Sequence, residues 1–279
     1  MCIRDSVDGD AVDPEEMADV YLPLARWIED RVAGRERPSR RVARTAAVIG
    51  ITGSVAVGKS TIARVLTQLL GRGPGRPAVE LLTTDGFLYP NRVLQERGLL
   101  DRKGFPETYD HRALVAVLEA VRSGRPEVGV PVYSHQTYDV VPGAVQWIRA
   151  PDLLVVEGLT VLQGGSGGGC RGAPGPESLI DLALYVDAAE TDLARWLTDR
   201  LLALRASGAG ASSDFLRWLS SLSETEARRL AASAWSEVNL VNLREHVAPT
   251  RIRADLILEK GADHRVRRVL VRTGAGPTG

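Results

Sequence analysis

The sequence predicts an α/β fold of three layers, in which a mostly parallel sheet is flanked by helices. Three observations support this prediction. A glycine-rich loop stands between a short apolar run and a stretch with apolar residues at helical spacing. Apolar runs of strand length then alternate with amphipathic stretches along the chain. The 279 residues, 44% of them hydrophobic, are enough for one large domain or two small ones.

Residues 1–45 are expected to form an N-terminal helical segment and a linker ahead of the main domain at 46–279. In DPEEMADVYLPLARWIEDRV, Asp13 is placed to cap a helix and Pro14 stands at the first helical position. The Arg-rich stretch 33–45 is interpreted as a solvated linker.

The loop GSVAVGKST fits the pattern G-x-x-x-x-G-K-[ST] of phosphate-binding loops. Backbone N–H groups of such a loop and the N-terminus of the following helix favour an anion. Lys59 is suited to the β- and γ-phosphates of a nucleotide, and the Ser60 hydroxyl to Mg²⁺. The expected nucleotide ligands are Gly53, Ser54, Val55, Ala56, Val57, Gly58, Lys59, Ser60 and Thr61. The sequence therefore predicts a P-loop NTPase-type fold that binds ATP with Mg²⁺.

Lysine is rare in this chain. Lys59, Lys103 and Lys260 are the three lysines among 35 basic residues. A chance match to a pattern that requires lysine is therefore rare. A compact ammonium also suits a phosphate cage better than a planar guanidinium. The presence of Lys59 in the loop favours a functional interpretation.

The remaining elements alternate between strands and helices, which predicts a parallel sheet covered on both faces. Strands are expected at 45–52, 79–84, 151–159 and 181–187, with late strands in ADLILEK and RVRRVLVR. Helices are expected at 60–70, 111–124, 190–206 and 223–247, the last with a capping box of Ser223 and Glu226. The glycine-rich stretch 164–177 is expected to be flexible.

Two carboxylates follow predicted strands. Asp85 comes after the second strand and Glu157 after the third. Ligands of such a sheet bind at the carboxyl ends of its strands. Beside a phosphate cage, the pair suggests a base for an attacking hydroxyl and a group that serves Mg²⁺. The alternative for each carboxylate is a strand-end turn or a helix cap.

The stretch PVYSHQTYDV gathers Tyr133, His135 and Tyr138 among polar neighbours. Tyr133 and His135 share a face if the chain is extended, which predicts a wall for a small polar substrate. The alternative is an ordinary hairpin with aromatic packing. The stretch holds no Arg or Lys, which argues against a sugar phosphate. On a later helix, Arg200 could stabilise a transferred phosphoryl group, or face solvent.

Composition argues against several classes of function. The net charge of zero gives no footprint for nucleic acid. No apolar run approaches the roughly 18 residues of a membrane span, and the N-terminus lacks the apolar core of a secretory signal. Cys2 and Cys170 have neither metal-ligand nor disulfide spacing. We therefore expect a cytoplasmic protein.

Six stretches of the chain, in order, resemble the bacterial type I pantothenate kinases. They are GSVAVGKST, LLTTDGFLYPN, KGFPETYD, PVYSHQTYDVVPG, LLVVEGLTVLQ and NLREHVAPTRIRADLIL. The motifs TTDGFLYPN and PVYSH together distinguish this family from its relatives phosphoribulokinase and uridine kinase. The resemblance runs from about Val20 to Arg272. It implies ATP-dependent phosphorylation of pantothenate to 4′-phosphopantothenate, the first step towards coenzyme A, by a homodimer.

The resemblance also implies roles for single residues. It implies a catalytic base at Asp85, phosphate and Mg²⁺ ligands at Lys59 and Ser60, a contact to the transferring phosphate at Arg200, pantothenate contacts at Tyr133, His135 and Asn239, an adenine neighbour at His264, and feedback inhibition by coenzyme A through Arg64. One position departs from the family. Leu197 stands where relatives usually carry a tyrosine that hydrogen-bonds pantothenate. We therefore expect a weaker pantothenate contact, which tyrosine at this position would restore.

Two other functions stay open on the sequence alone. One is a P-loop kinase for another small hydroxyl substrate, such as a pantetheine-like compound, a nucleoside or a sugar phosphate. The other is a nucleotide-binding regulator without turnover. The joint presence of Lys59, Ser60, Asp85 and Arg200 argues against the regulator, and Leu197 is the only argument for it.

Overall fold

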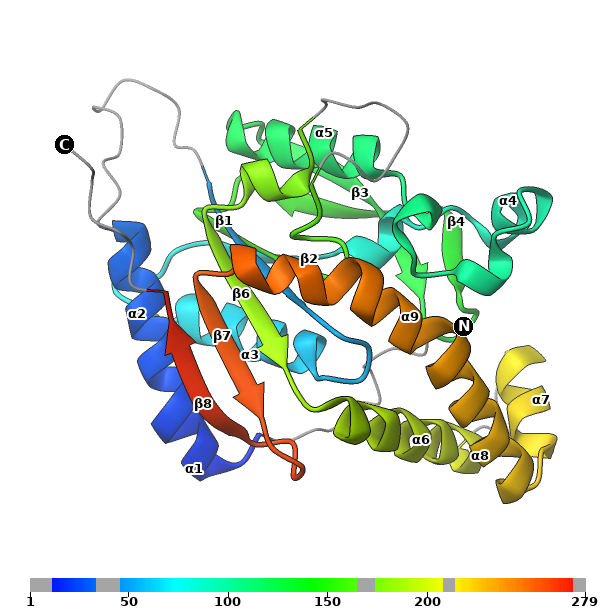
Figure 1. The fold of residues 1–279 in the computed structure, drawn as a ribbon. Coiled ribbons are helices and arrows are strands. Elements are labelled where there is room, and N and C mark those ends of the chain that lie inside the picture. Colours follow the sequence, from blue (N-terminus) through cyan, green and yellow to red (C-terminus); the bar gives the residue numbers. More distant parts are fainter. Residues whose placement is uncertain (1–11, 34–45, 165–173, 208–213, 273–279) are drawn as a thin grey trace.

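The structure is a computed structural model that describes residues 12–33, 46–164, 174–207 and 214–272 (Figure 1). Apart from Ala33, the predicted linker lies outside these residues, and the predicted domain boundary falls at its end. Residues 165–173 of the glycine-rich stretch also lie outside them.

A six-stranded sheet forms the centre of the molecule, with the strand order β2-β5-β1-β6-β7-β8. Its strands are β1 (Ala47–Gly53), β2 (Val79–Thr83), β5 (Leu153–Glu157), β6 (Leu182–Asp187), β7 (Leu256–Lys260) and β8 (Val266–Val271). All neighbours pair in parallel except β7 and β8, which are antiparallel. The inner strands are continuous apolar runs because both of their faces are buried. The predicted mostly parallel sheet is confirmed.

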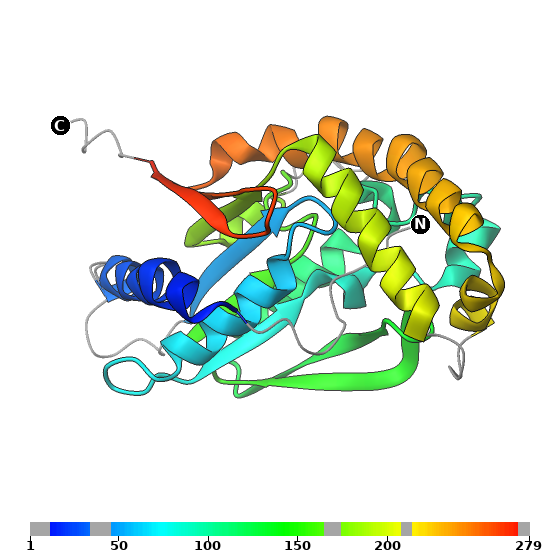
Figure 2. The same cartoon turned by 90° about the horizontal axis from the view of Figure 1, so that it is seen from below.

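Helices cover both faces of this sheet. The helices of the described residues are α1 (Pro14–Glu16), α2 (Leu22–Ala33), α3 (Lys59–Leu70), α4 (Asn91–Glu96), α5 (His111–Arg122), α6 (Glu190–Ser207), α7 (Asp214–Ser221), α8 (Glu224–Ser233) and α9 (Leu240–Asn242). Figure 2 shows α3 on one face and the long helix of α8 and α9 on the other, which confirms the three layers. The capping box of Ser223 and Glu226 is also confirmed at the start of α8.

Several of these helices are joined by short π-helical turns. The π-helical turn Met17–Tyr21 connects α1 to α2, and the turns Ala234–Asn239 and Leu243–Val247 flank α9. The described part of the N-terminal segment packs on the main domain, because Tyr21, Leu24, Ala25 and Ile28 belong to the hydrophobic core. None of the helices in the described ranges has both the length and the apolar content that crossing a membrane requires.

A second, two-stranded sheet stands apart from the central one. Its strands β3 (Glu127–Ser134) and β4 (Asp139–Arg149) pair antiparallel and form a hairpin. The stretch PVYSHQTYDV contains the end of β3, the turn and the start of β4, so the hairpin alternative was correct for its backbone. The turn includes Tyr138 at φ 55°, a left-handed conformation uncommon for residues other than glycine.

Candidate active site

Three strand ends meet at one edge of the central sheet. Glu157 pairs in register with Ile51 of β1 on one side and with Thr83 of β2 on the other. Asp85 follows Thr83 by two residues, and the phosphate-binding loop follows β1. The expected meeting of Asp85, Glu157 and the loop at the carboxyl ends of the strands is confirmed.

Glycines allow the phosphate-binding loop to turn tightly against its neighbours. Gly53 has φ 147°, and a Cβ atom there would lie 2.3 Å from the carbonyl oxygen of Val186. Gly58 has φ 91° and precedes the first residue of α3. Lys59 is buried, and its Nζ donates a hydrogen bond of 2.6 Å to the Ser54 carbonyl oxygen. The ammonium therefore lies inside the loop that contains it.

Ser60 and Glu157 place two oxygen atoms side by side. The Ser60 hydroxyl donates a hydrogen bond of 3.2 Å to Oε1 of Glu157. Oxygen is the ligand that Mg²⁺ prefers, and Mg²⁺ in kinases is held by few protein groups together with substrate phosphates. The described residues contain no group of three His, Cys, Asp or Glu that could hold a metal by itself. A hydroxyl and a carboxylate beside a phosphate loop therefore fit a Mg²⁺ site whose remaining ligands come from the phosphates of the nucleotide.

Asp85 lies in the buried 3₁₀ turn Thr84–Phe87, with 1% of its surface exposed. The hairpin approaches this turn closely, because a Cβ atom on Gly86 would lie 2.1 Å from the carbonyl oxygen of Pro131. Two residues later on β3 comes Tyr133, whose ring lies edge-on to His135 with centroids 5.2 Å apart. The packing of β3 on the turn thus brings the predicted substrate wall beside the predicted base.

Lys103 adds a cation to that wall. Its Nζ lies 5.0 Å from the centroid of the Tyr133 ring and donates hydrogen bonds to Asn91 Oδ1 at 2.6 Å and to the Tyr138 carbonyl oxygen at 2.5 Å. Only 7% of Lys103 is exposed. The sequence argument against a sugar phosphate was therefore incomplete. It relied on one stretch of sequence, and the cation comes from another.

A cavity of about 480 Å³ opens beside these residues. Its lining is Asn91, Leu100, Asp101, Lys103, Tyr133, Thr137, Tyr138, Phe215, Leu230, Ser233, Ala234, Glu237 and Val238. Asn239 comes next in the chain, but its buried Nδ2 donates a hydrogen bond of 2.7 Å to the Ala234 carbonyl oxygen within its own helix. Its contact with a substrate stays a prediction.

The β7–β8 loop borders the phosphate-binding loop from the other side. Nζ of Lys260 donates a hydrogen bond of 3.1 Å to the Val57 carbonyl oxygen. His264 stacks on Trp196 of α6, with centroids 3.8 Å apart and 24° between the ring planes. Arg200 follows Trp196 by four residues, so both occupy one face of α6.

Arg64 and Leu197 differ in their exposure to solvent. Arg64 is exposed on α3, where Nη2 lies 3.4 Å from Thr61 Oγ1. Leu197 has no exposed surface and packs in the hydrophobic core. It is absent from the residues that line the cavity, and the expected effect of Leu197 on pantothenate binding stays a prediction.

All three lysines of the chain lie around this site. Lys59 is inside the phosphate-binding loop, Lys260 holds its carbonyl, and Lys103 lies at the substrate wall. Of the three, only Lys59 has a role that its sequence motif predicts. The scarcity of lysine among 35 basic residues was the signal that could have indicated the other two.

Comparison with known proteins gives consistent matches. A model of the phosphoribulokinase / uridine kinase family matches residues 48–198. The pantothenate kinase of Myxococcus xanthus is 48% identical over 273 residues, which cover 95% of this chain and 86% of that protein. The pantothenate kinase of Leifsonia xyli is 49% identical over 272 residues, which cover 95% and 84%.

A solved structure shares the fold at low sequence identity. D-Glycerate 3-kinase from Cryptococcus neoformans has a TM-score of 0.63 at 13% identity, with 91% of this chain and 99% of that chain covered. At this identity the likeness concerns the fold alone. Together with the family match, it confirms the predicted P-loop type of three-layer fold.

Proposed function

Because the chain belongs to the pantothenate kinases, within the phosphoribulokinase and uridine kinase family, we propose that the site described above transfers the γ-phosphoryl group of ATP to pantothenate. The product is 4′-phosphopantothenate, and the reaction is the first step of coenzyme A biosynthesis. One structural observation supports this assignment most strongly. The phosphate-binding loop, the buried carboxylate of Asp85 and the wall of Tyr133 and Lys103 converge at one edge of the sheet.

The nucleotide end of the reaction belongs to the phosphate-binding loop. Lys59 would hold the β- and γ-phosphates of ATP, where its ammonium already lies within the loop. Ser60 and Glu157 would hold Mg²⁺, since their oxygens are adjacent. When bound, the metal neutralises charge on the phosphates. His264, stacked on Trp196 beside the loop, would neighbour the adenine base.

The transfer step needs a base and a stabilising cation. Asp85 would accept the proton of the pantothenate hydroxyl, because it is a buried carboxylate just past the end of β2, at the edge of the sheet where the phosphate loop follows β1. Arg200 would contact the transferring phosphoryl group from α6, where a guanidinium offsets developing charge. Both roles depend on placing the hydroxyl between Asp85 and the γ-phosphate.

Pantothenate carries a carboxylate, and the wall offers one cation that could recognise it. The ammonium of Lys103 is held by Asn91 and by the Tyr138 carbonyl at the rim of the cavity. We propose that Lys103 attracts the pantothenate carboxylate and that Tyr133 and His135 line its path. Asn239 would complete the contact after its amide leaves the Ala234 carbonyl.

Arg64 is the proposed site of feedback inhibition. Exposed one turn beyond Ser60, it would bind a phosphate of coenzyme A.

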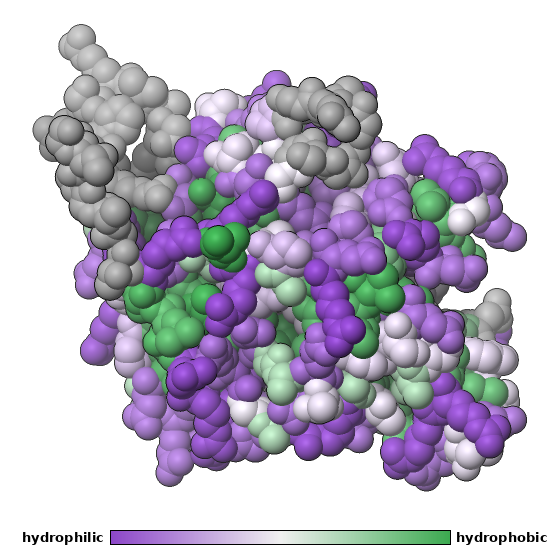
Figure 3. Space-filling view, in the orientation of Figure 1, coloured by the Kyte–Doolittle hydropathy of each residue, from purple (hydrophilic) through white to green (hydrophobic). Residues whose placement is uncertain are grey.

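A second copy of the chain would pair along the outer edge of β8. Val269, Leu270 and Val271 are exposed on β8 and Ile252 is exposed on the turn before β7, and Figure 3 shows hydrophobic surface over β7 and β8. The enzyme would work in the cytoplasm, which supplies ATP.

A second substrate class deserves a direct comparison because of Lys103. A buried ammonium at the wall would also attract the phosphate of a sugar phosphate. The alternative is therefore a P-loop kinase for an anionic sugar, and a nucleotide-binding regulator without turnover is the remaining one.

A coupled assay of ADP release separates these functions. The acceptors are pantothenate, pantetheine, a nucleoside and a sugar phosphate, each with ATP and Mg²⁺. We expect pantothenate to give the highest kcat/KM, with a phosphorylated product confirmed by mass. A sugar phosphate as the best acceptor would establish the alternative kinase. ATP binding without turnover of any acceptor would establish the regulator.

A further inference from the structure

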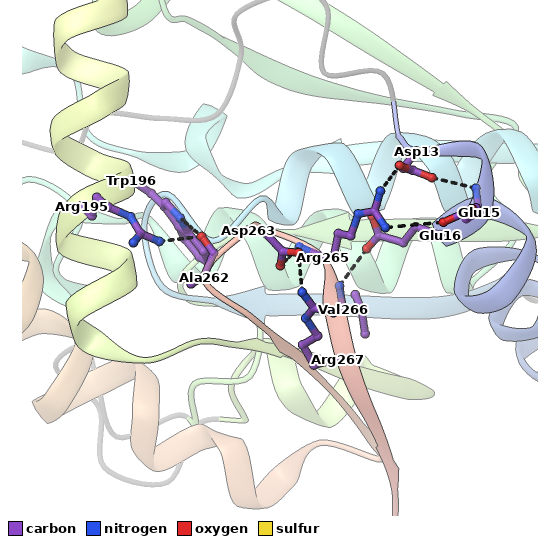
Figure 4. Close-up of polar contacts among 10 residues, drawn as sticks. All are labelled: Asp13, Glu15, Glu16, Arg195, Trp196, Ala262, Asp263, Arg265, Val266 and Arg267. Carbon is purple, nitrogen blue, oxygen red and sulfur yellow. Dashed lines mark hydrogen bonds and ion pairs between the residues drawn. The ribbon is translucent and has the colours of Figure 1, made fainter.

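The loop between β7 and β8 is held from two sides by elements far away in the sequence (Figure 4). On one side lies α6. Arg195 Nη2 and Trp196 Nε1 both donate hydrogen bonds to the Ala262 carbonyl oxygen, at 2.5 and 3.3 Å. The stacked rings of Trp196 and His264 add to this contact.

On the other side lies the N-terminal helix α1. Arg265 forms an ion pair with Asp13, and its Nη1 lies 3.6 Å from Oε2 of Glu15. The backbone N–H of Val266 donates a hydrogen bond of 2.9 Å to Glu16 Oε1. Figure 4 shows these three acidic side chains converging on the start of β8 from the first turn of the helix.

The acidic residues are themselves fixed. Oδ1 of Asp13 caps the helix by accepting a hydrogen bond of 2.8 Å from the Glu15 backbone N–H, while Oδ2 pairs with Arg265. Glu16 accepts a second bond, of 3.4 Å, from the hydroxyl of Tyr21. Burial, and next the Glu16 carboxylate, raise the pKa of Tyr21 above its ordinary value. Tyr21 belongs to the hydrophobic core. The contacts that Asp13, Glu15 and Glu16 make with the start of β8, called the tether below, are therefore anchored there.

The held loop is part of the nucleotide side of the site. Lys260, which comes just before it, contacts the carbonyl of Val57 in the phosphate-binding loop. His264 sits at φ 66°, a conformation that costs free energy for a residue with a side chain. Such a conformation persists only where the surroundings impose it. The hairpin's own turn hydrogen bonds, from Gly261 N–H to the Arg265 carbonyl and from His264 N–H to the Gly261 carbonyl, shape the loop, and the contacts from α1 and α6 hold the shaped loop in place.

We propose that Asp13 and Arg265 are positioning residues for the nucleotide, and that their ion pair fixes the His264 loop before ATP binds. This inference rests on the proposed function, because it takes the phosphate-binding loop to hold ATP. The physical reason is preorganisation. A loop that is already ordered loses less conformational freedom when the ligand arrives, so the ligand binds more tightly. Neither residue needs to touch the nucleotide.

Three substitutions test the tether. Asp13→Asn removes the charge and keeps the helix cap, since Asn caps helices as well as Asp. Arg265→Ala removes the partner, and Arg265→Lys keeps a positive charge. The matched control is Arg267→Ala, because Arg267 pairs with Asp263 in the same hairpin without reaching α1. The readouts are the Kd of a non-hydrolysable ATP analogue by calorimetry, the KM values for ATP and pantothenate, and kcat.

We expect Asp13→Asn and Arg265→Ala to raise the analogue Kd and the KM for ATP about fivefold, in proportion to a half-exposed ion pair. The KM for pantothenate and kcat should stay within about twofold of the wild type. The double variant should be no worse than either single one, because the pair acts as a unit. Arg265→Lys should recover part of the affinity, and Arg267→Ala should resemble the wild type.

An unchanged analogue Kd in both variants would overturn the inference. So would an equal rise of both KM values with a lower melting temperature, because that pattern belongs to a general loss of structure. Failure of the proposed function looks different. If the wild type binds the analogue but does not phosphorylate pantothenate, the proposed function fails. The analogue Kd of the variants then still tests the tether. A wild type that binds no nucleotide overturns both.

Discussion

Ser60 and Glu157 are joined by a hydrogen bond of 3.2 Å across 97 residues of sequence. The bond connects the first turn of α3 to the end of β5, so the helix that follows the phosphate-binding loop is fixed to the centre of the sheet. It also leaves a hydroxyl and a carboxylate next to each other at the place where a metal would meet the phosphates of ATP.

The first prediction concerns Glu157. Replacing it with Gln keeps the size of the side chain and a hydrogen-bond acceptor for Ser60, but removes the charge that favours a cation. We expect the Mg²⁺ concentration for half-maximal activity to rise about tenfold or more, the usual effect of losing a group that supports a metal site. The measurement is activity against Mg²⁺ at saturating ATP and pantothenate. An unchanged Mg²⁺ dependence would show that Glu157 only holds Ser60.

The second prediction concerns Asp85. Its burial at the end of β2 leaves the carboxylate in a turn of fixed geometry, where Asn can occupy the same space. We expect Asp85→Asn to lower kcat by about 10²-fold or more, because general-base catalysis is lost. Nucleotide binding, measured by calorimetry, should change little. Turnover near that of the wild type would remove Asp85 from the reaction.

The local motifs of the site could be predicted from sequence, because their geometry depends on neighbours along the chain. The phosphate-binding loop needs glycines where φ is positive, and Gly53 and Gly58 stand at those positions. The carboxyl ends of parallel strands share one edge, so Asp85 and Glu157 were expected together.

Contacts between distant segments could not be predicted in the same way. Lys260 meets Val57 across 203 residues, and Lys103 meets Tyr138 across 35. Such contacts depend on how the end of β7 and the turn between β3 and β4 pack against distant segments, and no pattern in the sequence specifies this packing. The burial of Leu197 could not be predicted either. A departure from the family pattern drew attention to this position, and only the packing of α6 shows that the side chain lies in the core.

The third prediction concerns Lys103 and discriminates between two ligands. Lys103→Met keeps most of the side-chain stem and removes the charge beside Tyr133. We expect the KM for pantothenate to rise about tenfold or more, because a charge-assisted hydrogen bond is worth about 1.5–3 kcal/mol. The KM for pantetheine, which lacks the carboxylate, should rise much less.

The comparison of the two acceptors controls for damage to the wall. Removing Lys103 also takes a donor from Asn91 and from the Tyr138 carbonyl, which would loosen the cavity for any acceptor. An equal rise in KM for pantothenate and pantetheine would therefore assign Lys103 a structural role. A selective rise for pantothenate would assign it to carboxylate recognition.

The fourth prediction reverses the expectation for Leu197. Because its side chain has no exposed surface, the larger ring and hydroxyl of Leu197→Tyr must displace core neighbours. Overpacking costs about 1–3 kcal/mol, which lowers the melting temperature by about 2–4 °C per kcal/mol in a domain of this size. Leu197→Met, of similar volume, is the matched control and should lose much less. A stable Tyr variant with a lower KM for pantothenate would contradict the placement of Leu197 in the core.

The fifth prediction concerns Arg64 and the proposed inhibition by coenzyme A. Arg64 is exposed and lies one turn beyond Ser60 on α3, so its guanidinium stands outside the phosphate cage but near its entrance. A phosphate of coenzyme A held by Arg64 would overlap the space of ATP without reproducing its contacts. We therefore expect coenzyme A to inhibit competitively with ATP and not with pantothenate.

Arg64→Ala should then weaken inhibition by coenzyme A about tenfold or more, in line with the loss of one charge-assisted bond of about 1.5–3 kcal/mol. The KM for ATP should change little, because the proposed holders of its phosphates are Lys59 and the loop backbone. Arg72→Ala is the matched control, since Arg72 is equally exposed just past the other end of α3. The measurement is steady-state inhibition at several ATP concentrations. If both variants are inhibited as strongly as the wild type, or if inhibition does not depend on ATP, coenzyme A does not act through Arg64.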